Sequence, residues 1–131
     1  MKSAAATAGM LSAAVLLSPG CGGEPEKASV EPVRRASFRS LAARDFLLTC
    51  PGAARRAETV RQAQRLEELK QLAIRKEAGQ AVALGENDWG AVARYSDREP
   101  CPPGEEAYGE ALAAFSGALD DFARRVAEHR P

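Results

Sequence analysis

The spacing of apolar residues predicts that this chain is built almost entirely of helices. Near the C-terminus, apolar side chains recur every three or four residues, which predicts a helix from Glu105 to about His129. The stripe consists of Tyr108, Leu112, Phe115, Leu119, Phe122 and Val126. No charged residue occurs from 111 to 119, so we expect this helix to be covered on several sides and to lie at the centre of the packing.

The same segment carries Gly109, Ala113 and Gly117 at a spacing of four residues. Glycine inside a helix costs about 1 kcal/mol relative to alanine. We therefore expect this row of small residues to let a neighbouring backbone approach closely.

Two further helices are predicted upstream. Apolar residues fall on one side at helical spacing over 37–48, and Pro51 follows the end of this pattern. Strong helix formers dominate from Ala53 to about Lys76, and Gly79 is available to end that helix. Its apolar stripe is Ala57, Val60, Ala63, Leu66, Leu69 and Ala73.

The segment 80–103 is interrupted by glycines and prolines, which predicts a mainly irregular return loop with one short helical turn over 88–94. The fold class is therefore all-α, a small three-helix domain over 34–131 with a long return loop. The loop holds Trp89, the only tryptophan, and Tyr95. These residues either dock the loop onto the helices as ordinary core or form a recognition surface.

The first twenty residues have the pattern of an export signal. Lys2 precedes a run without charge from Ser3 to Leu17, which is shorter than the roughly 20 apolar residues of a membrane-spanning helix. Small residues and Cys21 follow.

The segment from Leu17 to Cys21 resembles the lipobox of bacterial lipoproteins, with Gly20 before the cleaved bond. The resemblance implies acylation of Cys21 and a periplasmic protein held to a bacterial membrane by that lipid. An ordinary secretory signal cut near Gly20 is the alternative, and it would leave a soluble periplasmic or secreted protein. Residues 21–33 combine glycine, proline and charge, which predicts a flexible tether.

Once Cys21 is assigned to the signal or the lipid, Cys50 and Cys101 remain, and an even number suggests a structural disulfide in an oxidising compartment. Prolines flank both residues, so each lies where regular structure is interrupted. Such a bridge would place the end of the first helix beside the start of the last. The second and last helices would then run parallel, with the first antiparallel to them.

Charge supports this arrangement. Residues 53–78 carry seven basic and four acidic side chains, whereas residues 104–130 carry six acids and three arginines. The whole chain has 18 basic and 18 acidic residues, so no basic field for nucleic acid is present. Arg34, Arg35 and Arg39 follow the tether. They either touch anionic lipid head groups, if Cys21 is anchored, or form a solvated helix start.

No known catalytic, metal-binding or nucleotide-binding motif occurs, and no cofactor is expected. His129, the only histidine, is interpreted as part of a frayed terminus. We therefore predict a small exported protein that is not an enzyme and serves as an interaction or structural module, with a possible envelope protein as partner. A lipid or small-ligand carrier is the alternative, and catalysis is the least favoured class.

Overall fold

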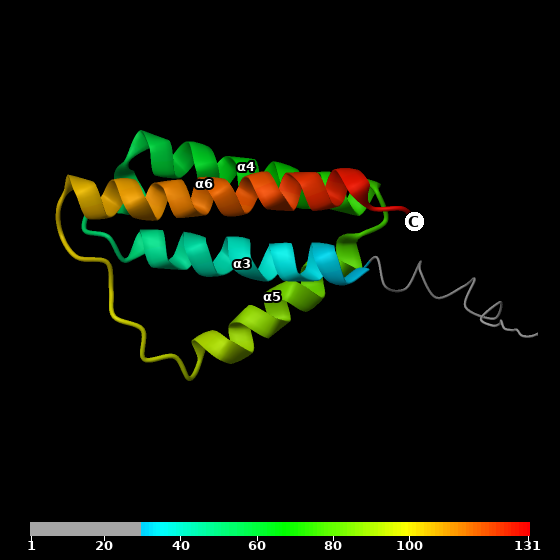
Figure 1. The fold of residues 1–131 in the computed structure, drawn as a ribbon, viewed down its shortest axis with the longest axis horizontal. Coiled ribbons are helices and arrows are strands. Elements are labelled where there is room, and N and C mark those ends of the chain that lie inside the picture. The colour runs from blue at the N-terminus through cyan, green and yellow to red at the C-terminus, as the bar shows by residue number, and fades with distance from the viewer. Residues whose placement is uncertain (1–29) are drawn as a thin grey trace, which may run out of the picture.

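The computed structural model describes residues 30–131, which form an all-α domain, as predicted (Figure 1). It contains four α-helices where the sequence predicted three, and a short 3-10 helix. The elements are α3 (Val30–Leu48), η3 (Ala53–Arg55), α4 (Ala57–Arg75), α5 (Gly79–Ala93) and α6 (Glu105–Glu128).

The directions of α3, α4 and α6 agree with those predicted. The Cys50–Cys101 disulfide is present and joins the end of α3 to the residues just before α6, so these two helices are antiparallel. Helices α4 and α6 run parallel. Arg56 at the start of α4 pairs with Glu105 at 2.9 Å, and Arg65 pairs with Asp120 at 2.7 Å. The opposite charge excess of these two helices therefore reflects direct contact.

Helix α5 occupies a segment that we expected to be mainly loop. Its buried residues recur at helical spacing and face α3; they are Ala81, Val82, Gly85 and Trp89. Gly85 is required there, because a Cβ atom at this position would lie 2.5 Å from the carbonyl oxygen of Arg34. The glycine that suggested a break therefore permits the helix to pack.

The turn between α4 and α5 also differs from the prediction. Gly79 begins α5 and does not end α4. Glu77 takes the left-handed conformation that reverses the chain, with a φ of 61°.

The folded domain begins earlier than predicted. Helix α3 starts at Val30, so residues 30–33 belong to it and not to the predicted tether. Pro32 lies in the first turn, where a helix tolerates proline because the missing N–H would have no partner within the helix. Val33 is fully buried, and this apolar contact favours the longer helix. Residues 21–29 lie outside the described part of the chain.

The central helix is α3 and not α6. Helix α3 lies between α5 and α6 and packs extensively against both, whereas α6 packs mainly on α3 and α4 (Figure 1). The residues predicted to allow close approach, Gly109 and Gly117, face open space instead. The absence of charge along the middle of α6 therefore does not indicate burial on all sides.

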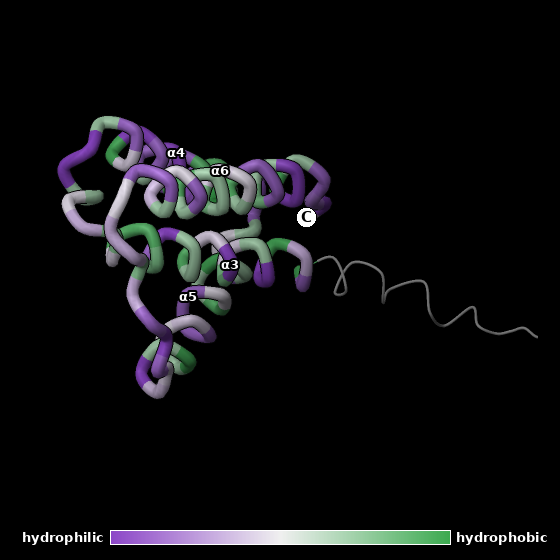
Figure 2. Tube along the Cα trace, turned by 60° about the vertical axis from the view of Figure 1, so that its left-hand side comes forward, coloured by the Kyte–Doolittle hydropathy of each residue, from purple (hydrophilic) through white to green (hydrophobic). Residues whose placement is uncertain are grey.

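Most of the core lies between α3, α4 and α6, and Ala81, Val82 and Trp89 of α5 extend it. Its fully buried side chains include those of Phe115, Leu119, Phe122 and Val126. Leu112, from the same predicted stripe, is only half-buried. In α4, Leu66, Leu69 and Ala73 face the core, but Val60 is 43% exposed. The chain between α5 and α6 is largely hydrophilic and crosses one end of the domain (Figure 2).

Candidate functional site

A surface groove of about 210 Å³ lies where the end of α3, the C-terminal half of α5 and the following chain meet. Residues from all three segments line it: Asp45, Phe46, Thr49, Trp89, Ala93, Ser96, Arg98 and Glu99. Because α5 diverges from the end of α3, residues after Ala93 must span the opening on their way to α6 (Figure 1).

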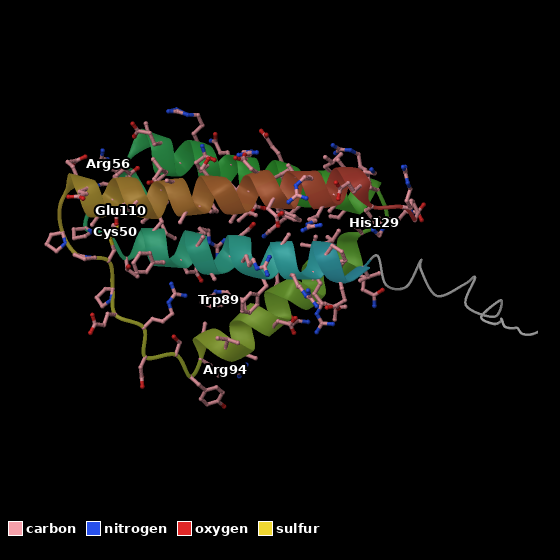
Figure 3. The ribbon with its side chains drawn as sticks, in the orientation of Figure 1. Cys50, Arg56, Trp89, Arg94, Glu110 and His129 are labelled. Atoms are coloured by element: carbon pink, nitrogen blue, oxygen red, sulfur yellow. A yellow bond between two sulfur atoms is a disulfide. The ribbon has the colours of Figure 1, made fainter. Side chains whose placement is uncertain are left out.

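Trp89 forms a wall of this groove and also belongs to the core. Its side chain extends from α5 toward α3 (Figure 3), and the residue is 9% exposed. The ring meets Phe38 edge to face, with centroids 5.6 Å apart. The indole Nε1 donates to Asp45 Oδ2 at 2.6 Å. Both ends of the tryptophan are thus fixed, so the wall is preformed.

Asp45 accepts two hydrogen bonds within the protein. Its Oδ1 accepts from Arg44 Nε at 3.0 Å, while its Oδ2 accepts from Trp89. The carboxylate therefore orients both Arg44 and Trp89.

Arg98 connects the exposed chain to the groove. Its guanidinium carbon lies 5.4 Å from the ring centroid of Trp89 and 5.5 Å from that of Phe46. Cation–π contacts of this kind stabilise by about 0.5–1 kcal/mol at exposed sites. Arg98 therefore holds the chain against the aromatic wall without filling the groove.

Residues 94–100, which we call the 94–100 loop, are all exposed. Tyr95 is 84% exposed and does not line the groove. The loop is nevertheless fixed at both ends, by α5 on one side and by Cys101 on the other. Cys101 is held by the disulfide and by a hydrogen bond from its backbone N–H to Thr49 Oγ1 at 2.8 Å.

An arginine near the start of α3 and an aspartate next to Trp89 on α5 connect these two helices. Arg34 donates to both carboxylate oxygens of Asp88, at 2.7 and 3.0 Å. This hydrogen bonding lowers the pKa of Asp88 and raises that of Arg34. The Arg56–Glu105 pair is similar: its hydrogen bonds lower the pKa of Glu105 and raise that of Arg56.

The structure does not bring the predicted site residues together in one site. Trp89 lines a cleft, as the recognition alternative required, but it is also packed as core. Tyr95 is 84% exposed on the adjoining loop, so it is not packed as core. The predicted lipidation site, Cys21, lies outside the described residues.

Sequence analysis missed most of the groove. Asp45 and Phe46 belong to the predicted first helix and Thr49 directly follows it, and only the fold brings them to the loop. One signal was present, since Asp45 interrupts the apolar face of that helix beside Phe46.

The interpretation of His129 as a frayed end is wrong. It is 5% exposed, and its buried Nδ1 has no hydrogen-bond partner within residues 30–131. It lies at the far end of the bundle from Cys50 and Arg56 (Figure 3). Within the same residues, no group of three or more His, Cys, Asp or Glu side chains is placed to hold a metal ion.

None of the helices described between residues 30 and 131 is both long and apolar enough to cross a bilayer. Comparisons with protein-family models, with curated proteins and with solved structures gave no match to this chain.

Proposed function

We propose that this chain is an exported envelope protein, anchored through an acylated Cys21, that binds another envelope protein without catalysing a reaction. The binding region consists of the groove beside Trp89 and the 94–100 loop. The observation that carries the proposal is this exposed loop, which the Cys50–Cys101 disulfide fixes at one end.

Export is supported by two independent features. The first twenty residues have the signal pattern, and the disulfide belongs to the class of bond that persists in oxidising compartments. A bridge that closes a loop of this length stabilises by about 4 kcal/mol. A small domain depends on such a contribution.

Protein binding is supported by two properties of the 94–100 loop: it is exposed, and its conformation is already restricted. Tyrosine is enriched at protein interfaces, and Tyr95 is the most exposed large apolar residue within 30–131. Because Cys101 and Arg98 already restrict the loop, ordering it on binding costs less conformational entropy than ordering a free segment would.

A carrier role has less support. Phe115, Leu119 and Phe122 fill the space between the helices, and the groove beside Trp89 is open at the surface. Catalysis also has less support, because the sequence contains none of the known catalytic motifs.

The test is site-specific photo-crosslinking in intact cells, with a photoreactive amino acid at Tyr95. The matched control carries it at Arg61, which is exposed on α4 away from the groove. We expect one adduct of defined mass from position 95 and none from position 61. The same adducts from both positions, or none from position 95, would contradict protein binding by the loop.

Location is tested separately by the intact mass of the chain recovered from the envelope. We expect a chain that begins at Cys21, carries acyl groups and has no free thiols. Recovery of an uncleaved chain from the cytoplasm with Cys50 and Cys101 reduced would overturn the export part of the proposal.

A further inference from the structure

A second hollow, of about 220 Å³, lies near the start of α3 and is lined by Pro32, Arg35, Arg39 and Arg125. Spacings of three and four residues place the first three on one face of α3. Arg125 comes from the last turn of α6, which lies beside the start of α3 because the two helices are antiparallel. Three arginine side chains from two helices therefore line one hollow, and none of the lining residues is acidic.

These arginines keep most of their hydrogen-bond donors free. Arg35 Nε is 3.7 Å from Glu31 Oε2, and Arg125 Nε is 3.4 Å from Asp121 Oδ1. Both distances exceed the roughly 2.7–2.9 Å of a charge-assisted hydrogen bond. Among residues 30–131, no carboxylate lies within ion-pairing distance of Arg39, and Arg125 Nη1 is also 4.0 Å from Glu128 Oε1.

Arg34, which the sequence grouped with Arg35 and Arg39, does not take part. It lies on the side of α3 that faces α5 and donates both of its hydrogen bonds to Asp88. Arg34 thus has a close partner within the fold, whereas Arg35 has only a distant one and Arg39 has none among residues 30–131.

We propose that this hollow binds a phosphate group. Like charges repel one another, so three guanidinium groups around one hollow favour an anion between them. The planar donor fork of arginine matches phosphate oxygens and can bind them in pairs. The first turn of α3 adds a smaller favourable term, since the N-terminal end of a helix attracts negative charge.

The phosphate belongs to an anionic lipid head group, and this step rests on the proposed anchorage at Cys21. Helix α3 begins nine residues after Cys21, a length that spans at most about 32 Å of chain. An acyl anchor would thus keep this end of the domain within reach of the membrane surface. The groove lies toward the other end of α3: Arg35 and Thr49 are fourteen residues apart, about 21 Å along the helix.

The experiment uses the full disulfide-bonded chain with Cys21→Ser, so that no acyl chain contributes to binding. It compares Arg35→Gln/Arg39→Gln with a control of equal net charge, Arg55→Gln/Arg61→Gln, at two exposed arginines elsewhere. One probe is inorganic phosphate, followed by NMR of the arginine side-chain N–H groups. The other is vesicle co-sedimentation, with phosphatidylcholine alone or with half phosphatidylglycerol.

We expect binding to the phosphatidylglycerol vesicles but not to phosphatidylcholine alone. Each arginine removed from the hollow should weaken vesicle binding about five-fold, and the pair by about 25-fold. The control pair should change it by less than about three-fold. Arg125→Gln should weaken binding like one of the other two, although it lies on a different helix.

Phosphate shifts at Arg35, Arg39 and Arg125 without selective vesicle binding would support a phosphate site but overturn the lipid as its source. Equal loss in both double variants would overturn the site, because binding would then reflect overall charge. The same holds if the Arg35→Gln/Arg39→Gln variant, shown to be folded by circular dichroism, binds both probes normally. A partner adduct from Tyr95 in that case would leave the proposed function standing.

Discussion

The hydroxyl of Thr49 joins two segments that are far apart in the sequence. It accepts a hydrogen bond from the backbone N–H of Cys101 at 2.8 Å and donates one to the carbonyl oxygen of Phe46 at 2.6 Å. Thr49 therefore ties the last turn of α3 to the end of the 94–100 loop, directly beside the disulfide. The groove keeps its shape because this end of the loop is held by two kinds of bond.

Replacing Thr49 by valine removes both hydrogen bonds with little change in shape. We expect a loss of about 1 kcal/mol in the free energy of unfolding, because the half-buried N–H of Cys101 loses its acceptor. Urea denaturation of the oxidised protein measures it. Thr49→Ser keeps the hydroxyl and is the control; equal stability of the two variants would contradict the role assigned to this bond.

Removing the disulfide by Cys50→Ser/Cys101→Ser should cost about 4 kcal/mol in the free energy of unfolding, since the unfolded chain regains the entropy of an open loop. Hydrogen exchange should increase most in the 94–100 loop and the first turn of α6. Cys21→Ser is the control and should leave stability unchanged. A loss below about 1 kcal/mol would show that packing alone fixes this end of the domain.

The two glycines inside α5 should respond in opposite ways to alanine. Gly85→Ala places a methyl group 2.5 Å from the Arg34 carbonyl oxygen and 2.9 Å from Ser37 Cβ, so α5 must shift away from α3. We expect a destabilisation of about 1–3 kcal/mol. Thermal denaturation measures this change.

Gly90 is the internal control, because a Cβ atom there would meet nothing within 4 Å. Gly90→Ala should stabilise the domain by up to about 1 kcal/mol through helix propensity. A stabilising Gly85→Ala would disprove the close contact between α3 and α5.

The Arg34–Asp88 pair predicts a specific effect of acid. Its hydrogen bonds lower the pKa of Asp88 in the folded protein, so the folded state releases this proton more readily than the unfolded state does. The stabilisation is therefore complete above the unfolded pKa of Asp88 and is lost as the pH falls through the lower, folded value. Denaturant midpoints measured from neutral pH to about pH 3 record this loss.

Asp88→Asn should make that pH dependence shallower, because the titrating group is removed. Asp97→Asn, at an exposed position in the 94–100 loop, is the control and should retain the full slope. Identical slopes for Asp88→Asn and the unsubstituted protein would show that the pair does not stabilise the fold.

The sequence was sufficient for those elements whose periodicity is uninterrupted. The residue patterns of α3, α4 and α6 predicted three helices, and the pairing of Cys50 with Cys101 predicted their directions. Helix α5 was missed because Gly85 and Gly90 were interpreted locally as breaks. A glycine is needed at position 85 only because α3 packs against it. This contact is tertiary, so the local sequence pattern does not reveal it.

The groove was harder to predict for the same reason. Trp89 stood out as the only tryptophan, but its hydrogen-bond partner Asp45 precedes it by 44 residues. The uncharged middle of α6 led to the wrong prediction that this helix is buried on several sides. Small residues such as Gly117 can face solvent on a helix surface.

The central position of α3 has a consequence for how the chain acquires its structure. The helix synthesised first among those described packs mainly against α5 and α6, and α6 is synthesised last. The apolar face of α3 therefore cannot pack against α6 until nearly the whole chain has been synthesised. A core of this kind closes late, so folding is delayed until synthesis is almost complete.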